Sequence, residues 1–130
     1  MTKFLGPYTE YAYAALRIVA GFMFACHGAQ KLFGVLGAQA ELGDPLGMTA
    51  GLIEFFGGLL IALGLIAGYA ALVASGEMAV AYFKAHAGRG FWPILNRGEM
   101  AILYCFIFLY IAFRGAGTIS LDALFQRHQD

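Results

Sequence analysis

The stretch LRIVAGFMFACHGAQKLFG, residues 16–34, decides the fold, because it is apolar for most of its length and carries polar side chains toward its end. A helix that crosses a bilayer needs about 20 mostly apolar residues, which this stretch and the turn before it supply. His27, Gln30 and Lys31 are spaced so that they share one stripe of such a helix. Ionisable groups are costly against lipid, so the stripe predicts a bundle interior or a wet cavity.

The composition of the whole chain indicates a membrane protein in contact with the lipid bilayer. Of its 130 residues, 61% are hydrophobic and 12% are charged, whereas soluble domains carry about 25% charged residues. The formal net charge is zero, with 8 basic and 8 acidic residues, so nucleic acid is not an expected partner. The N-terminus lacks the compact apolar core of a cleavable signal peptide, and we expect Met1 to belong to the mature chain.

The pattern predicts an all-α, single transmembrane domain over residues 1–130, an up-down-up-down four-helix bundle with short loops. Its helices are expected near 11–33, 49–67, 69–87 and 97–114. Thr49 is a candidate N-cap of the second helix, and Ser120 a candidate cap of a small interfacial helix at the C-terminus. Four spans place both termini on one side of the membrane. The lysines and arginines divide evenly between the two sides, so the orientation stays open.

Because successive helices alternate in direction, one end of the bundle collects nearly all of the ionisable side chains that interrupt the apolar runs of residues 12–115. Within it, Lys31 is expected to pair with Glu54 or Glu99, since a buried unpaired charge is costly. Glu54 and Glu77 have short side chains that do not reach water from their depth, which favours a functional role or a stabilising buried network. Lysines near helix ends can instead extend to the headgroups, His27 can be a satisfied interior histidine, and Glu99 can be a favourable charge in the first turn of a helix.

Metal and redox motifs do not account for these residues. No ExxH motif occurs, so a dinuclear metal site is not predicted, and one ion held by the carboxylates and histidines is a minor alternative. The sequence has no motif for haem, flavin or an iron–sulfur cluster. Cys26 and Cys105 lie in different apolar runs without CxxC spacing, and we interpret them as two small buried residues, with a redox pair as the alternative.

Four blocks of the sequence resemble the DoxX family of small bacterial membrane proteins. They cover most of residues 16–124 and read LRIVAGFMFACHGAQKLFG, GLIEFFGGLLIALGL, EMAVAYFKAHAGRGFWPILNRGEMAILY and GAGTISLDAL. The polar positions that match the recurrent pattern of the family are His27, Gln30, Lys31, Glu54, Glu77, His86, Trp92, Asn96 and Glu99. Arg97 stands where the family would lead us to expect glycine or a small polar residue, so the turn before the fourth helix is expected to differ.

The resemblance implies a four-helix, multi-pass protein of the bacterial inner (cytoplasmic) membrane. The family name comes from a subunit associated with thiosulfate:quinone oxidoreduction, and related members are linked to membrane oxidoreductase complexes and to oxidative or thiol stress. The leading hypothesis is therefore a redox accessory subunit that binds a quinone-like ligand or docks a soluble or membrane oxidoreductase. If the chain takes part in an enzyme, we expect an oxidoreductase subunit linked to the quinone pool, and homo-oligomerisation is left open.

Each polar residue receives a role in this hypothesis. His27 and Glu77 would relay protons. Trp92 would cover the entrance, and the ligand would be bound by Gln30, Lys31, Glu54, His86, Trp92, Asn96 and Glu99. Two alternatives remain: a transporter or channel for a small solute, with carboxylates lining a half-pore, and a non-catalytic scaffold or assembly factor whose buried ionic network only fixes the fold.

Overall fold

The computed structural model describes residues 1–129, and this part of the chain is all-α without strands, as predicted. There are four long helical stretches in the described residues. Three are single helices: α2 (Thr9–Phe33), α5 (Ala67–Ala85) and α7 (Glu99–Arg114). The fourth, second in chain order, is continuous and consists of α3 (Pro45–Leu52), η2 (Ile53–Gly57) and α4 (Gly58–Leu63). Short helices occupy the ends and loops: α1 (Thr2–Leu5), η1 (Gly6–Tyr8), η3 (Ala87–Arg89), α6 (Pro93–Asn96) and α8 (Leu121–Arg127).

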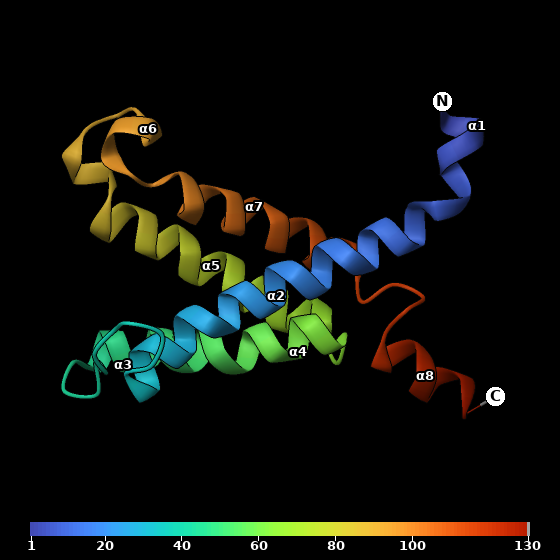
Figure 1. Ribbon diagram of the computed structural model, residues 1–130, viewed down its shortest axis with the longest axis horizontal. Helices are drawn as coiled ribbons and strands as arrows, with labels where there is room; N and C mark the ends of the chain where they lie inside the picture. The colour runs from blue at the N-terminus through green and yellow to red at the C-terminus, as the bar shows by residue number, and fades with distance from the viewer. Residues whose placement is uncertain (130) are drawn as a thin grey trace.

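The long helices alternate in direction and form two pairs (Figure 1). In one pair α2 packs along α3, η2 and α4, and in the other α5 packs along α7. The pairs join where α4 and η2 contact α5, whereas α2 and α7 touch little and diverge. We call the end with the 34–44 loop and α6 the site end, and the end with α8 and both termini the terminal end (Figure 1).

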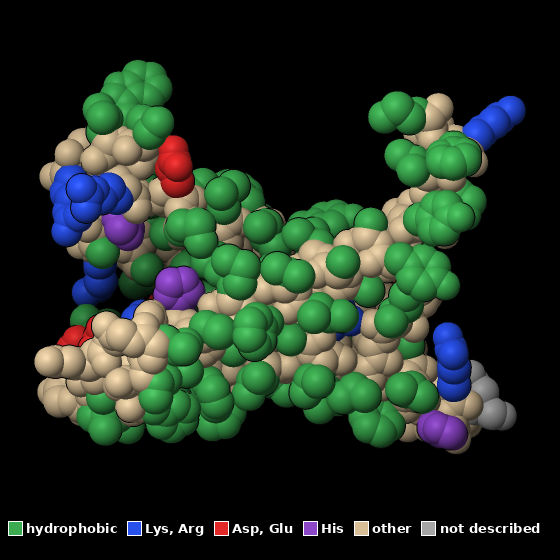
Figure 2. All heavy atoms as spheres, viewed as in Figure 1, with side chains coloured by type: hydrophobic (Ala, Val, Ile, Leu, Met, Phe, Trp, Pro, Cys, Tyr) green, Lys and Arg blue, Asp and Glu red, His purple; other side chains and the backbone are tan. Residues whose placement is uncertain are grey.

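Two segments are long and apolar enough to cross a membrane, residues Thr2–Phe33 and Pro45–Leu63. Figure 2 shows hydrophobic side chains covering the middle of the visible face, while most charged side chains gather toward its two ends. An apolar outer surface of this kind suits lipid contact. Inside, Phe24, Ile61, Phe108 and Ile111 are fully buried.

The second predicted helix begins earlier than the sequence analysis placed it, and its expected cap was wrong. The Asp44 carboxylate accepts hydrogen bonds from the amides of Leu46 and Gly47, at 3.2 and 3.1 Å, so Asp44 is the N-cap. Pro45 follows as the first helical residue, a position that suits its fixed φ and missing N–H. Thr49 lies one turn inside, where its hydroxyl donates to the Pro45 carbonyl.

The fourth predicted helix begins at Glu99 rather than at 97 because Arg97 adopts a left-handed backbone, with φ 62° and ψ 23°. A side chain in this conformation crowds the following carbonyl, so glycine is the favoured residue there. The expectation of glycine or a small residue at position 97 thus has a conformational reason. At the C-terminus, Ser120 does cap α8 by accepting a hydrogen bond from the Ala123 amide.

Glycines bring α2 against the second helix at backbone distance. A Cβ built on Gly28 would lie 2.2 Å from the Phe55 nitrogen, and one built on Gly58 would lie 2.5 Å from the Ala25 nitrogen. Such close approach of helix backbones is typical of small residues in membrane bundles. The α2 backbone thus fills the space beside Gly58. This close contact holds η2, which carries Glu54, against the stripe of His27 and Lys31.

Candidate functional site

A polar cavity of about 240 Å³ lies at the site end between α2, η2, α5 and α7. Its apolar walls come from residues such as Phe24 and Met78. The side chains in its lining that can donate or accept hydrogen bonds are His27, Lys31, Glu54, His86 and Tyr104. Acidic, basic and phenolic groups therefore meet in one small volume among apolar helices.

Glu54 is the most deeply buried carboxylate of the cavity, with 2% of its surface exposed. It sits on the π-helical segment η2, a rare geometry that often occurs at functional sites. Its Oε1 accepts a hydrogen bond from Lys31 Nζ at 2.8 Å, which is one of the two ion pairs predicted from the sequence. Its Oε2 is buried and has no hydrogen-bond partner in the described chain. Half of this carboxylate is thus available to a ligand.

Glu77 lies in an adjoining side cavity of about 380 Å³ between α3 and α5. Lys31 and Ala81 line both cavities, so the two spaces meet at the Lys31 side chain. Glu77 Oε2 is also buried without a hydrogen-bond partner in residues 1–129. Lys84 also lines this side cavity. This arrangement places a second carboxylate next to the ion pair.

Tyr104 is a site residue that the sequence analysis missed. It is 5% exposed, and no group in the described residues bonds to its buried hydroxyl oxygen. Its ring lies edge-on to His27, with 6.2 Å between the ring centroids, and stacks on Phe108. The available signal was its position on α7, one helical turn beyond Glu99 and toward the apolar interior. Tyrosine hydroxyls usually have a partner when buried.

Of the other predicted site residues, one lines the polar cavity and two are bonded within loops. His86 lines the polar cavity, and its Nδ1 is 3.1 Å from the Asn96 carbonyl. Asn96 is fully buried, but its amide is used within the loop, donating to Tyr82 Oη and the Gly90 carbonyl and accepting from the Gly98 amide. Gln30 donates to the Leu36 carbonyl and closes the loop after α2.

Trp92 and Glu99 do not lie at the cavities. Trp92 is 63% exposed, its ring lies edge-on to that of Phe91, and it belongs to the lining of neither cavity. Glu99 is exposed in the first turn of α7. The polar cavity thus gathers His27, Lys31, Glu54 and His86, with Glu77 beside them, whereas Gln30, Asn96, Trp92 and Glu99 lie elsewhere.

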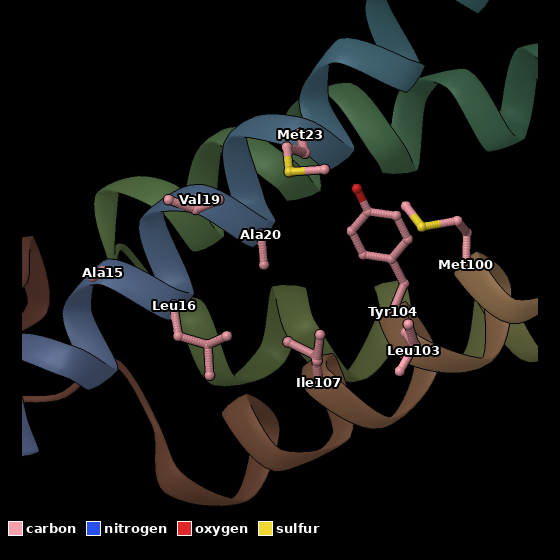
Figure 3. A pocket seen from close by; sticks show the side chains of 9 residues that line it. All are labelled: Ala15, Leu16, Val19, Ala20, Met23, Met100, Leu103, Tyr104 and Ile107. Carbon is pink, nitrogen blue, oxygen red and sulfur yellow. The ribbon is translucent and has the colours of Figure 1, made fainter.

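An apolar groove of about 390 Å³ runs between α2 and α7, where these helices diverge. Figure 3 shows Tyr104 projecting from α7 toward α2, with its hydroxyl near the side chains of Met23 and Met100. Tyr104 and Met100 line both the groove and the polar cavity. The rest of the lining is apolar: Ala15, Leu16, Val19, Ala20, Met23, Leu103 and Ile107.

The arrangement can hold a polar head group and exchange protons with it. Lys31 and Tyr104 offer hydrogen-bond donors, Glu54 and Glu77 offer free carboxylate oxygens, and the His27 imidazole can donate from one ring nitrogen and accept at the other. Within residues 1–129, no three His, Cys, Asp or Glu side chains come together in a way that could hold a metal ion. Cys26 and Cys105 are free thiols, and Cys105 Sγ lies 3.5 Å from the Ser75 hydroxyl.

Comparisons with known proteins found a family match and a similar protein. The DoxX family model matches residues 12–87, more than half of the chain. An uncharacterized protein of Haemophilus influenzae (strain ATCC 51907 / DSM 11121 / KW20 / Rd) is 45% identical over 128 residues, covering 93% of this chain and 96% of its own. No solved structure matches the chain. Because the family match covers more than half of the chain, the chain belongs to the DoxX family.

Proposed function

We propose that this DoxX family membrane protein binds the ring of a quinone-type ligand in the polar cavity, as a subunit of a membrane redox system. One observation carries the proposal: three buried oxygens, Glu54 Oε2, Glu77 Oε2 and Tyr104 Oη, have no hydrogen-bond partner in the described residues. Leaving a buried polar atom unpaired costs about 1–3 kcal/mol. Three of them around two neighbouring cavities that share Lys31 in their linings indicate a place where a ligand completes the hydrogen bonds.

The proposal includes an up-down-up-down bundle in which all four long helical stretches cross the bacterial inner membrane. At 1.5 Å per residue, the 16 residues of α7 span about 24 Å and the 19 of α5 about 29 Å. A stretch shorter than the roughly 30 Å hydrocarbon core is accommodated by local thinning or by flanking residues that reach the headgroups. The apolar outer surface and the alternating helix directions support this arrangement.

A quinone ring suits the chemistry of the cavity. Its two carbonyl oxygens accept hydrogen bonds, and Lys31 and Tyr104 are donors at the cavity wall. Reduction follows Q + 2 e⁻ + 2 H⁺ → QH₂. The electrons come from the reduced cofactor of a partner oxidoreductase, and each carbonyl oxygen takes up one proton. Glu77 lines the side cavity and His27 the polar cavity, and Lys31 lines both. In this proposal Glu77 and His27 pass the protons toward the ring.

Binding of a tailless benzoquinone to the protein in phospholipid nanodiscs tests the proposal. We expect Glu54→Gln to weaken binding about tenfold, because it removes the charge that orients Lys31; tenfold corresponds to ~1.4 kcal/mol. Glu99→Gln is the matched control, since Glu99 is exposed and lines neither cavity, and we expect it to bind like the wild type. Equal binding by both variants, or no binding by the wild type, would contradict a ring site at Glu54.

The scaffold alternative has its own support, because the Lys31–Glu54 pair joins α2 to η2. In that case Glu54→Gln and Glu77→Gln should lower the midpoint of thermal unfolding, while no quinone binds to the wild type. A solute pathway has less support. At the terminal end the fully buried Arg17 donates to the carbonyls of Ile61, Ala62 and Ile119, so these hydrogen bonds are used by the fold and do not serve a solute.

A further inference from the structure

The apolar groove between α2 and α7 begins at the polar cavity and leads away from it into the apolar middle of the protein. Tyr104 and Met100 belong to both linings, so the two spaces share a wall. On α2 the groove extends from Met23 back to Ala15, about 12 Å along the helix. Polarity therefore falls continuously from the Glu54 end of the site to the far end of the groove.

The boundary between the two spaces carries the strongest indication of a ligand. The Tyr104 hydroxyl oxygen is buried, has no bonding partner in residues 1–129, and points toward α2 between two methionine side chains (Figure 3). His27, one helical turn beyond Met23 on α2, is exposed although it also lines the polar cavity. The cavity is thus open sideways, between the diverging helices, and not only toward the loops.

From these observations we propose that the groove between α2 and α7 binds the isoprenoid tail of a membrane quinone, which enters the polar cavity laterally past Tyr104. This inference rests on the proposed ring site and adds the place of the tail and the lateral route by which the ligand enters from the lipid. The order of polarity matches such a molecule, since its ring would reach Glu54 and its tail would lie against branched aliphatic and methionine side chains. Methionine adapts to irregular flexible chains.

The lining of the groove favours a tail over a protein helix as the occupant. Apart from the Tyr104 hydroxyl, the lining residues are apolar and include the long side chains of Leu16, Met23 and Ile107. Helix packing in lipid depends on small residues that allow backbones to approach. At the contact of α2 with η2 and α4 such residues are Gly28 and Gly58. The groove between α2 and α7 has no glycine in its lining, and its two alanines, Ala15 and Ala20, stand among seven larger side chains.

The test compares two ligands with the same benzoquinone ring, one tailless and one with an isoprenoid tail, in phospholipid nanodiscs. Concentrations are expressed per mole of lipid, so that partition into the bilayer is removed. We expect the tailed quinone to bind about tenfold more tightly. Val19→Trp, which fills the groove, should abolish this difference and leave binding of the tailless ring unchanged. Ile18→Trp is the control, because Ile18 is the neighbouring exposed residue outside the groove.

The outcomes separate the tail from the ring. Tailless binding that depends on Glu54, with no gain from the tail or with equal effects of V19W and I18W, would overturn the tail site and leave the ring site standing. Native mass spectrometry that finds a phospholipid retained by the wild type, lost in V19W and not displaced by the tailed quinone would also overturn it. Failure of both ligands to bind the wild type would overturn the ring site and, with it, this inference.

Discussion

The site end and the terminal end both bury ionisable side chains among apolar helices, yet they treat them differently. At the terminal end, Arg17 is 1% exposed and donates to the carbonyls of Ile61, Ala62 and Ile119, at 2.6, 2.7 and 2.6 Å. Those carbonyls belong to the last turn of α4 and to the segment before α8, where backbone acceptors lack helical partners. A buried cation there completes the backbone hydrogen bonds of the fold.

Other polar groups at the terminal end also have partners within the chain. Asp122 accepts from the amides of Ile66 and Ala67 at the start of α5, at 2.9 and 3.4 Å. Glu10 pairs with Arg114, whose guanidinium also lies 3.9 Å from the centre of the Tyr13 ring. Most of these groups are matched within the chain, while Arg17 Nε finds no bonding partner in the described residues.

The site end instead leaves three buried oxygens without partners in the described residues, on Glu54, Glu77 and Tyr104. Buried charge is therefore not by itself a sign of function, because a charge whose hydrogen bonds are matched by backbone groups stabilises the fold. Buried oxygens left unpaired around a cavity are the better indication of a ligand, because their cost is recovered only when something binds.

Arg17→Met should have the largest effect on stability. The substitution leaves three carbonyls without their donor and frees the segment that leads to α8; the recovered cost of burying the guanidinium offsets part of this loss. We expect the free energy of unfolding to fall by ~3 kcal/mol. Far-UV circular dichroism during denaturation in mixed micelles measures it.

The contrast between the ends gives this experiment a control and a second readout. Arg127→Met removes the same charge from an exposed position and should leave unfolding unchanged. Folded R17M protein should still bind the tailless quinone like the wild type, since Arg17 lies at the end away from the site. A variant as stable as the wild type would show that the terminal end does not depend on Arg17.

A smaller effect, a gain in stability, is expected at the site end from Arg97→Gly. Arg97 has a left-handed backbone at the end of α6, which costs an L-residue roughly 1–2 kcal/mol. Glycine relieves this strain but gains chain entropy in the unfolded state, so the net increase should be about 0.5–1 kcal/mol. Denaturation in mixed micelles measures it. Arg89→Gly, which removes the same charge from η3, should be neutral or destabilising, and an equal gain there would assign the effect to charge.

The sequence was sufficient to predict an all-α chain and the end of the bundle at which Lys31, Glu54 and Glu77 gather, since both follow from periodicity and from the spacing of polar residues in apolar runs. The Lys31–Glu54 pair was one of two alternatives, and only packing of η2 against α2 distinguishes Glu54 from the exposed Glu99. Asn96 and Gln30 carry side-chain amides, which can bind a ligand, but in this protein these amides donate to backbone carbonyls of loops. That use depends on backbone geometry, which spacing does not reveal.

Tyr104 and Arg17 show the other limit of prediction from the sequence. A tyrosine among apolar residues is usually part of a core, and an arginine near a helix end usually extends to the headgroups. Their roles depend on what surrounds each buried polar atom: three carbonyls around Arg17, and no partner within residues 1–129 for the Tyr104 hydroxyl. This information exists only in three dimensions.

Tyr104→Phe should give the smallest change in stability and the clearest separation of folding from binding. The substitution removes one buried oxygen that no described group bonds, and it keeps the ring that packs on Phe24 and Phe108. Removing an unpaired buried polar atom is neutral or slightly stabilising, so unfolding should change by less than about 0.5 kcal/mol. Quinone binding should nevertheless weaken about tenfold, because the ligand loses a donor at the cavity wall.

Tyr110→Phe, on the same helix but outside the cavity, is the control. If Y104F bound quinone as well as the wild type, the unpaired oxygens would lose their value as the sign that distinguishes the site end from the terminal end.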